Sequence, residues 1–170
     1  MKQALINFYY QFHTKQHYFL CHDILEEAWK AQNHYSKTDA VVSLILCATG
    51  CYHYRRANYK GAHTLFQRAY RVAHLNRYVL SDLGLKANDY LHMLKGYARA
   101  AQQHLTFEPM ELPVLLSFTK AIQTVYPDYA MMQQVSTLPY ICDHHLLRDR
   151  HEVENARLEA LKLKQLKDKK

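Results

Sequence analysis

Two short fragments of this sequence place histidine beside charged side chains, within stretches that otherwise predict buried helix. They are residues 22–29 (HDILEEAW) and residues 52–58 (YHYRRAN). A buried imidazole or carboxylate needs a hydrogen-bonding or charged partner, whereas a solvated one needs none. The two fragments therefore mark the place where a functional site would lie.

Helical geometry brings three of these polar side chains together. With about 100° between consecutive residues of an α-helix, Glu26 lies about 40° from His22, and Trp29 lies about 20° from it on the other side. This face must point inward because Trp29 would otherwise be exposed, while Glu27 points away into solvent. His53 lies on the inner face of the following helix. We therefore expect His22, Glu26 and His53 to form one buried polar cluster.

Three kinds of chemistry fit such a cluster. The first is a structural hydrogen-bond network that fixes how the helices pack. The second is a site for zinc or another divalent metal, because two histidines and one glutamate are suitable ligands; such a site would support a hydrolase. The third is a pocket for a small molecule or anion, with the histidines and Arg55 or Arg56 as donors. The residues themselves leave all three open.

The elements that must position these residues are predicted to be helices. Residues 1–108 contain no proline, the whole chain has only four glycines, and apolar residues recur at helical spacing. We expect helices over about 3–13, 18–32, 38–56, from 62 onward, and over 86–104. Prolines interrupt residues 105–141, and a charged helix is expected over 142–167. The prediction is an all-α fold: a bundle of about five core helices in residues 1–105, with an extension over 106–170 that packs on it and ends in a long charged helix.

Composition argues against a membrane protein and against a disordered chain. Hydrophobic residues make up 49% and charged residues 22% of the sequence, and the longest uncharged run, residues 40–54, is too short to cross a bilayer. The net charge of +7 comes partly from five lysines after residue 161, which we interpret as a solvated helix end rather than a nucleic-acid site. The cysteines are predicted to be buried free thiols, as in a cytoplasmic protein: Cys21, Cys47, Cys51 and Cys142.

Both fragments carry a family resemblance. Residues 18–29 (YFLCHDILEEAW) resemble the signature Y-F-E-A-H-E-x-L-E-x-x-W of domain-of-unknown-function family 309, an uncharacterised bacterial family, and residues 53–62 (HYRRANYKGA) resemble its Y-H-x-x-x-G-N-x-x-G-A segment. Together they cover roughly residues 15–75. Residues 145–150 (HLLRDR) resemble an H-x-L-R-D-R segment of a bacterial branch. Cys21, Asp23 and Ala57 depart from the family pattern, which has alanine, glutamate and glycine at those places.

The resemblance implies an all-α bundle but no activity, because the family has no assigned biochemistry. Its motif residues in this chain are His22, Glu26, Glu27, Trp29, His53, Asn58 and Gly61, and the third segment adds His145, Arg148 and Asp149. Asn58 and Gly61 have a ready structural role in a tight turn between helices with left-handed backbone geometry.

The sequence favours a small cytoplasmic helical protein that acts as a non-enzymatic interaction or scaffold module for a protein partner, built around His22, Glu26 and His53. The alternative is a divalent-metal-dependent hydrolase or a small-ligand-binding protein that uses the same residues. A second alternative is weak nucleic-acid binding through the basic C-terminal tail. The sequence indicates no cofactor other than that metal, and no membrane contact.

Overall fold

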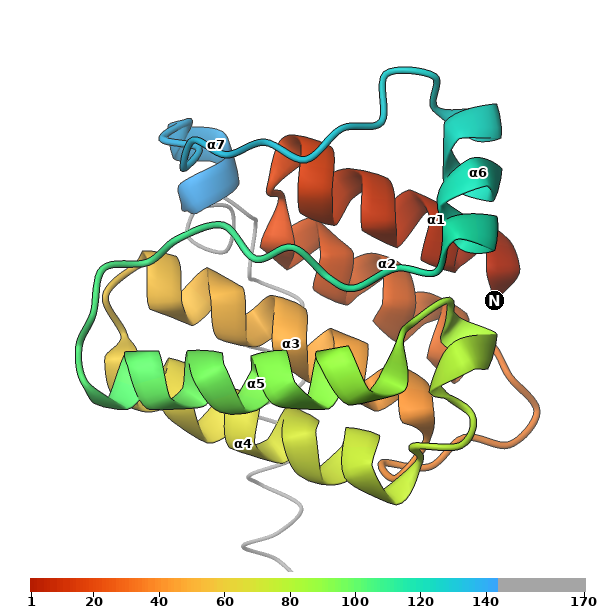
Figure 1. The fold of residues 1–170 in the computed structure, drawn as a ribbon, viewed down its shortest axis with the longest axis horizontal. Coiled ribbons are helices and arrows are strands. Elements are labelled where there is room, and N and C mark those ends of the chain that lie inside the picture. Colours follow the sequence, from red (N-terminus) through yellow and green to blue (C-terminus); the bar gives the residue numbers. More distant parts are fainter. Residues whose placement is uncertain (144–170) are drawn as a thin grey trace, which may run out of the picture.

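The all-α fold is confirmed by the computed structural model of the protein, which describes residues 1–143 (Figure 1). No strand occurs within these residues. The elements in chain order are α1 (Lys2–Tyr10), a π-helical turn η1 (Gln11–Lys15), α2 (Tyr18–Lys30), α3 (Ala40–Arg55), α4 (Tyr59–Leu75), a 3-10 turn η2 (Leu80–Leu83), α5 (Ala87–Gln102), α6 (Leu116–Val125) and α7 (Pro139–Cys142).

The long helices agree with the predicted ones to within a few residues, and two parts of the prediction need correction. Helix α4 begins at Tyr59 instead of about residue 62, because the Asn58 side chain caps it by accepting from the Gly61 N–H at 3.0 Å. Helix α6 lies inside the segment that was expected to be broken by prolines. The predicted charged helix over 142–167 lies outside the described residues apart from its first two positions.

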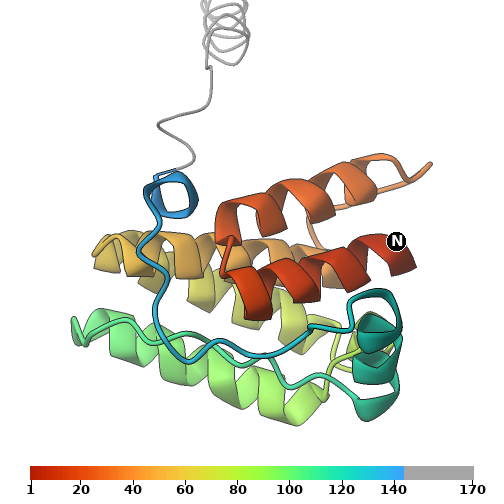
Figure 2. The ribbon, with the colours of Figure 1, turned by 90° about the horizontal axis from the view of Figure 1, so that it is seen from above.

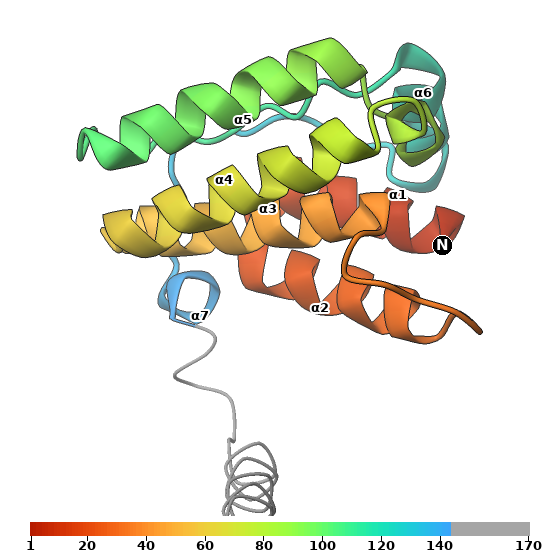
Figure 3. The same ribbon diagram turned by 90° about the horizontal axis from the view of Figure 1, so that it is seen from below.

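Helix α3 is the central element, as its nearly continuous apolar sequence predicts. It packs against α2 on one side and α4 on the other, and α5 in turn covers α4 (Figures 1 and 3). Gly50 of α3 lets α4 approach closely, because a β carbon there would lie 2.7 Å from the Phe66 ring. The close packing of this helix pair fixes where the C-terminal end of α3 and the start of α4 meet, and the candidate site lies beside that point.

The segment after α6 runs along α1 and η1 (Figures 1 and 2). Its backbone is held by η1 and by Gln16, which follows η1. The His13 carbonyl accepts from the Met132 N–H at 3.1 Å, and Gln16 donates to the carbonyls of Met132 and Gln134 at 3.0 and 2.7 Å. These bonds bring α7 to the end of α3, beside the candidate site. Among the described residues, none of the helices combines the length and the apolar character that a bilayer span requires.

Candidate functional site

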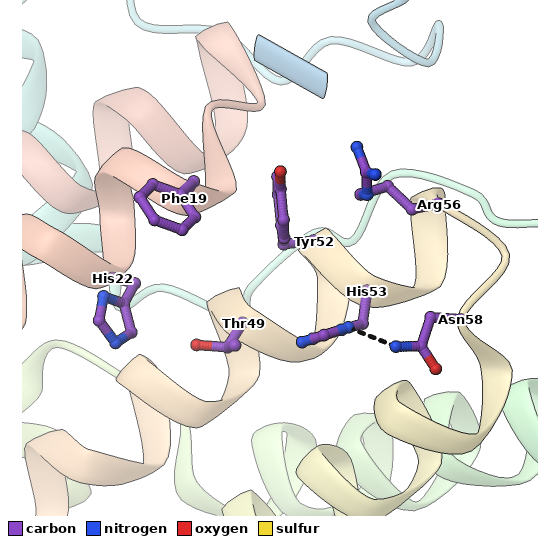
Figure 4. A pocket seen from close by; sticks show the side chains of 7 residues that line it. All are labelled: Phe19, His22, Thr49, Tyr52, His53, Arg56 and Asn58. Carbon is purple, nitrogen blue, oxygen red and sulfur yellow. Dashed lines mark hydrogen bonds between the residues drawn. The ribbon is translucent and has the colours of Figure 1, made fainter. Parts of the chain in front are cut away.

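A pocket of about 370 Å³ opens between α2 and α3, at the place that the two sequence fragments marked. Figure 4 shows the side chains around it, which come from α2, from α3 and from the turn that follows α3. Both predicted histidines are among them. The lining residues are Phe19, His22, Thr49, Tyr52, His53, Arg56 and Asn58.

Helical spacing explains the two walls. Thr49, Tyr52 and His53 of α3 and Arg56, its C-cap, stand at positions i, i+3, i+4 and i+7, so they share one face. On α2, His22 lies three positions after Phe19, and their rings stack with centroids 6.1 Å apart. The Phe19 ring also meets the Tyr52 ring edge to face at 5.4 Å, which joins the two walls.

His53 is the polar group whose orientation the fold fixes. Asn58 Oδ1 accepts from the Gly61 N–H at 3.0 Å, so the Asn58 amide nitrogen is the donor toward His53 Nδ1, at 2.8 Å. Because Nδ1 accepts this bond, the neutral imidazole of His53 carries its proton on Nε2. Burial lowers the pKa of His53 below its ordinary value, and the charge of Arg56 lowers it further. The ring therefore offers a neutral N–H donor on the side away from Asn58 (Figure 4).

Arg56 brings a positive charge to the rim of the pocket. Its guanidinium lies over the Tyr52 ring, 5.6 Å from the centroid, and donates to the Cys142 carbonyl at 3.0 Å. The same nitrogen pairs with the Asp143 carboxylate. Asp143, from a distant part of the chain, thus places a negative charge next to the Arg56 guanidinium. An acidic ligand of Arg56 would compete with this carboxylate.

The expected three-residue cluster does not assemble. His22 and His53 line the same pocket, but Glu26 does not: its carboxylate pairs with Lys30, one turn further along α2, at 3.1 Å. His22 instead pairs with Asp23 at 3.0 Å. All three predicted residues are half-buried rather than buried. Helical geometry predicted the side of α2 on which Glu26 lies, but the Glu26 side chain remains partly exposed to solvent.

The metal set that the sequence suggested is therefore not formed by these three side chains. Within residues 1–143, no group of three or more histidine, cysteine or carboxylate side chains is arranged to hold a metal ion.

The other predicted positions have separate roles. Trp29 is buried and its indole N–H donates to the Asp39 carboxylate at 2.8 Å, so it ties the end of α2 to the start of α3. Glu27 is exposed, as expected. Arg55 does not line the pocket, and it donates to the carbonyls of Gln16 and Ile141 at 2.8 and 2.9 Å. The predicted His145, Arg148 and Asp149 lie outside the described residues.

The cysteines are free, as predicted, and three of the four are buried. Cys142 is the exception: it is only half-buried, because it lies in the short helix α7 at the edge of the bundle.

The turn from α3 to α4 differs from the prediction in one residue. The left-handed backbone lies at Ala57, with φ 55°, and not at Asn58 or Gly61. The N–H groups of Ala57 and Asn58 return to the carbonyls of Tyr54 and His53 at 3.0 and 2.9 Å, which is the hydrogen-bond pattern of a glycine-ended helix. A β carbon on Gly61 would lie 2.8 Å from the Asn58 amide, so Gly61 makes room for the cap.

We expect Ala57→Gly to stabilise the protein by about 1 kcal/mol, because the exposed alanine is held in a backbone region that costs an L-residue roughly that much. Urea unfolding followed by circular dichroism measures the change. Ala31→Gly is the control, since Ala31 is also exposed at a helix end but has φ −74°; it should not be stabilising. Equal effects of the two substitutions would contradict the explanation.

Sequence reasoning missed Phe19 and Tyr52 as pocket residues, although Tyr52 stands inside one of the two fragments and Phe19 lies three positions before the other. The signal was present in the spacing. Positions 49, 52, 53 and 56 describe one helix face, and that face contains aromatic and cationic groups together.

Comparison with known proteins agrees with the predicted family. Residues 5–65 match the family described as Domain of unknown function (DUF309), and this range contains the motif residues from His22 to Gly61. The chain is also similar to "Uncharacterized protein YpuF" of Bacillus subtilis (strain 168), with 29% identity over 156 residues that cover 89% of each chain. No solved structure matches the chain.

Proposed function

We propose that this protein, which carries a DUF309 domain over residues 5–65, is a binding module whose α2–α3 pocket takes a small ligand with a planar ring and an acidic group. The observation that carries the proposal is the pairing of two donors in one pocket. His53 offers an N–H whose orientation is set by Asn58, Arg56 offers a guanidinium, and none of the residues that line the pocket is a carboxylate.

The two donors suit an anion for different reasons. A guanidinium has five N–H groups and forms strong, charge-assisted bonds to carboxylate or phosphate oxygens. His53 contributes a neutral donor at neutral pH, because burial and Arg56 lower its pKa. A hydrogen bond to a carboxylate needs no charge on the imidazole, so binding would persist where His53 is neutral.

The remaining walls suit a flat, apolar body. Phe19 and Tyr52 meet edge to face and expose ring surface to the pocket, and such rings pack well against another aromatic group. A volume of about 370 Å³ lies within the range of small-molecule sites, roughly 300–1,000 Å³. The Thr49 hydroxyl donates to the Ile45 carbonyl at 2.8 Å, so its lone pairs remain for a donor on the ligand.

A simple ligand series tests the proposal. Benzoate and phenylphosphate are compared with the neutral analogue benzamide by isothermal titration and thermal shift. The acids should bind, whereas the amide should bind weakly or not at all. Arg56→Gln should weaken binding of the acids about tenfold or more, since a hydrogen bond to a charged group contributes about 1.5–3 kcal/mol.

Two further variants make this test specific. Glu26→Gln is the matched control: Glu26 lies on α2 near His22 but outside the pocket, so binding should be unchanged. Asp143→Asn removes the carboxylate that competes for Arg56, so it should strengthen binding. Equal binding of acid and amide, or acid binding that survives Arg56→Gln undiminished, would show that the pocket is not an acid site.

We also propose that the protein is cytoplasmic. Its four cysteines are free thiols, and free thiols are usual where the surroundings are reducing.

A further inference from the structure

A second concave site lies between α4 and α5, and it shares no lining residue with the α2–α3 pocket. These helices lie side by side (Figures 1 and 3), and a groove of about 450 Å³ runs between them. Its floor is apolar, from Leu94 and Ala98, and its rims are polar. The rim residues are His63, Gln67, Tyr70, Arg71, Lys95, Arg99 and Gln102.

Charge is the unusual property of this groove. Arg71 comes from α4, and Lys95 and Arg99 come from α5, so cations stand on both rims. No carboxylate lines the groove. Helix α4 has no acidic residue at all, and α5 has one, Asp89 in its first turn. The three cations therefore raise the local positive potential without a compensating charge nearby.

Three cations in the described part of the chain have an acidic partner. Lys15 pairs with Asp128, Lys30 with Glu26, and Arg56 with Asp143. Arg71, Lys95 and Arg99 have no such partner within residues 1–143. Cations that face one another across a groove repel each other unless an anion lies between them, so this arrangement suits an external anion better than solvent alone.

Aromatic groups lie next to the cations. The Tyr70 ring has the Lys95 ammonium 4.8 Å from its centroid on one side and stacks with His74, one turn further along α4, at 5.7 Å. His63 donates from Nδ1 to the Ala98 carbonyl at 2.8 Å, which ties the two helices together at the groove floor. A positive groove with aromatic rings along it is the usual design of a surface for single-stranded nucleic acid.

We propose that the α4–α5 groove binds the phosphate backbone of single-stranded nucleic acid through Arg71, Lys95 and Arg99, with the Tyr70–His74 pair beside it as a stacking surface. This site is separate from the α2–α3 pocket and does not depend on the function proposed for it. It is also separate from the lysines near the C-terminus.

Fluorescence anisotropy of the full chain with a short labelled oligodeoxythymidylate tests the groove. Binding should weaken with salt, with a slope of log affinity against log salt of about −2 for three phosphate contacts on a single strand. Arg71→Glu combined with Arg99→Glu should weaken binding about tenfold or more. The milder pair Arg71→Gln and Arg99→Gln should reduce the slope, and it gives the same test if the glutamate pair is poorly folded.

The control is a charge reversal outside the groove, compared with Arg71→Glu alone, which changes the net charge by the same amount. Arg68 lies on α4, is exposed and does not line the groove, so Arg68→Glu should leave most of the affinity. A second control replaces the five lysines after residue 161 by glutamine and should also leave binding.

Three outcomes would overturn the proposal. They are an equal loss in Arg68→Glu, loss of binding only in the lysine variant, and equal binding of polyglutamate, which would mean that the groove selects negative charge rather than nucleic acid. Protection from unfolding by inorganic phosphate or triphosphate without oligonucleotide binding would overturn it as well, because the site would then be one for small phosphates.

Discussion

Replacement of Gly84 by alanine is expected to destabilise the protein by about 2–4 kcal/mol. Gly84 follows η2 with φ 83°, a left-handed conformation that costs an L-residue roughly 1–2 kcal/mol. A β carbon there would also lie 2.5 Å from Phe118 Cγ, well inside van der Waals contact. Overpacking of this kind adds about 1–3 kcal/mol, so steric contact and backbone strain act in the same direction.

Phe118 cannot move aside easily. Its ring packs edge to face on Tyr9 at 5.5 Å, and the Tyr9 hydroxyl donates to the Leu83 carbonyl at 2.8 Å, just before Gly84. The Gly84 carbonyl accepts from the Leu115 N–H at 2.7 Å, at the start of α6. The glycine, the ring and the helix are thus held by one another, and a shift of any of them breaks a hydrogen bond or an aromatic contact.

Gly96→Ala provides the matched control. Gly96 is exposed within α5, and a β carbon there would meet no atom within 4 Å. Alanine should therefore stabilise the protein by up to about 1 kcal/mol through helix propensity. Urea unfolding of both variants at neutral pH measures the contrast. If Gly84→Ala is as stable as the native chain, the close contact with Phe118 does not exist in solution.

The role of Gly84 also shows where sequence-based prediction stops. Helices α2 to α5 could be predicted because their apolar residues recur at helical spacing and no proline interrupts them. Helix α6 lies between Pro113 and Pro127, and of its residues only Ile122 is buried. Contacts with distant parts of the chain hold it, such as those of Phe118 with Tyr9 and Gly84. No local pattern encodes these contacts, so neither the helix nor its glycine could be inferred.

The candidate site was predictable to the extent that helical phase decides it. Phase alone brought His22 and His53 to one pocket. Helical phase could not predict how deeply each side chain is buried. Glu26 lies about 40° further round α2 and reaches the surface, where Lys30 pairs with it. The sequence contained that alternative partner at the usual i,i+4 spacing. The anionic partner of Arg56 comes from Asp143, 87 residues away, and only the fold could reveal it.

Acidification from about pH 6.5 to pH 4 is expected to remove about 3 kcal/mol of stability through one residue, His13. Its side chain is only 4% exposed, and burial lowers its pKa from the ordinary 6.5 to about 4. Each pKa unit corresponds to about 1.4 kcal/mol, so a difference of 2.5 units between the unfolded and folded chain gives a loss of about this size.

The bonds of His13 explain why its neutral form is preferred. Nε2 accepts from the Leu112 N–H at 2.9 Å, so the neutral ring carries its proton on Nδ1, which faces the Tyr129 hydroxyl. Protonation of Nε2 would set two N–H groups against each other and leave the buried Leu112 donor without an acceptor. Glu111 is near, but its charge acts on Tyr129, whose pKa is raised to about 12 by burial and by that carboxylate.

The sign of the effect follows from proton binding. Between pH 6.5 and 4 the unfolded chain holds a proton on residue 13 and the folded chain does not, so stability falls as the pH falls. The contribution is complete above about pH 6.5 and lost below about pH 4. The backbone carbonyl of His13 also accepts from the Met132 N–H. The loss of stability should therefore appear first as loosening of the segment that runs along η1.

Denaturant unfolding at several pH values between 7 and 4 measures this dependence in the native chain and in His13→Gln. The glutamine variant should be less stable at pH 7 but lose less stability on acidification, so the difference between the two should shrink as the pH falls. His34→Gln changes an exposed loop histidine and should keep the native pH dependence. Carboxylates titrate in the same range, but they are common to all three proteins and cancel in the comparison. A difference in unfolding free energy between the native chain and His13→Gln that stays constant from pH 7 to 4 would contradict this explanation. It would mean that the pKa of His13 is the same in the folded and the unfolded chain, so its burial is not what makes the fold sensitive to acid.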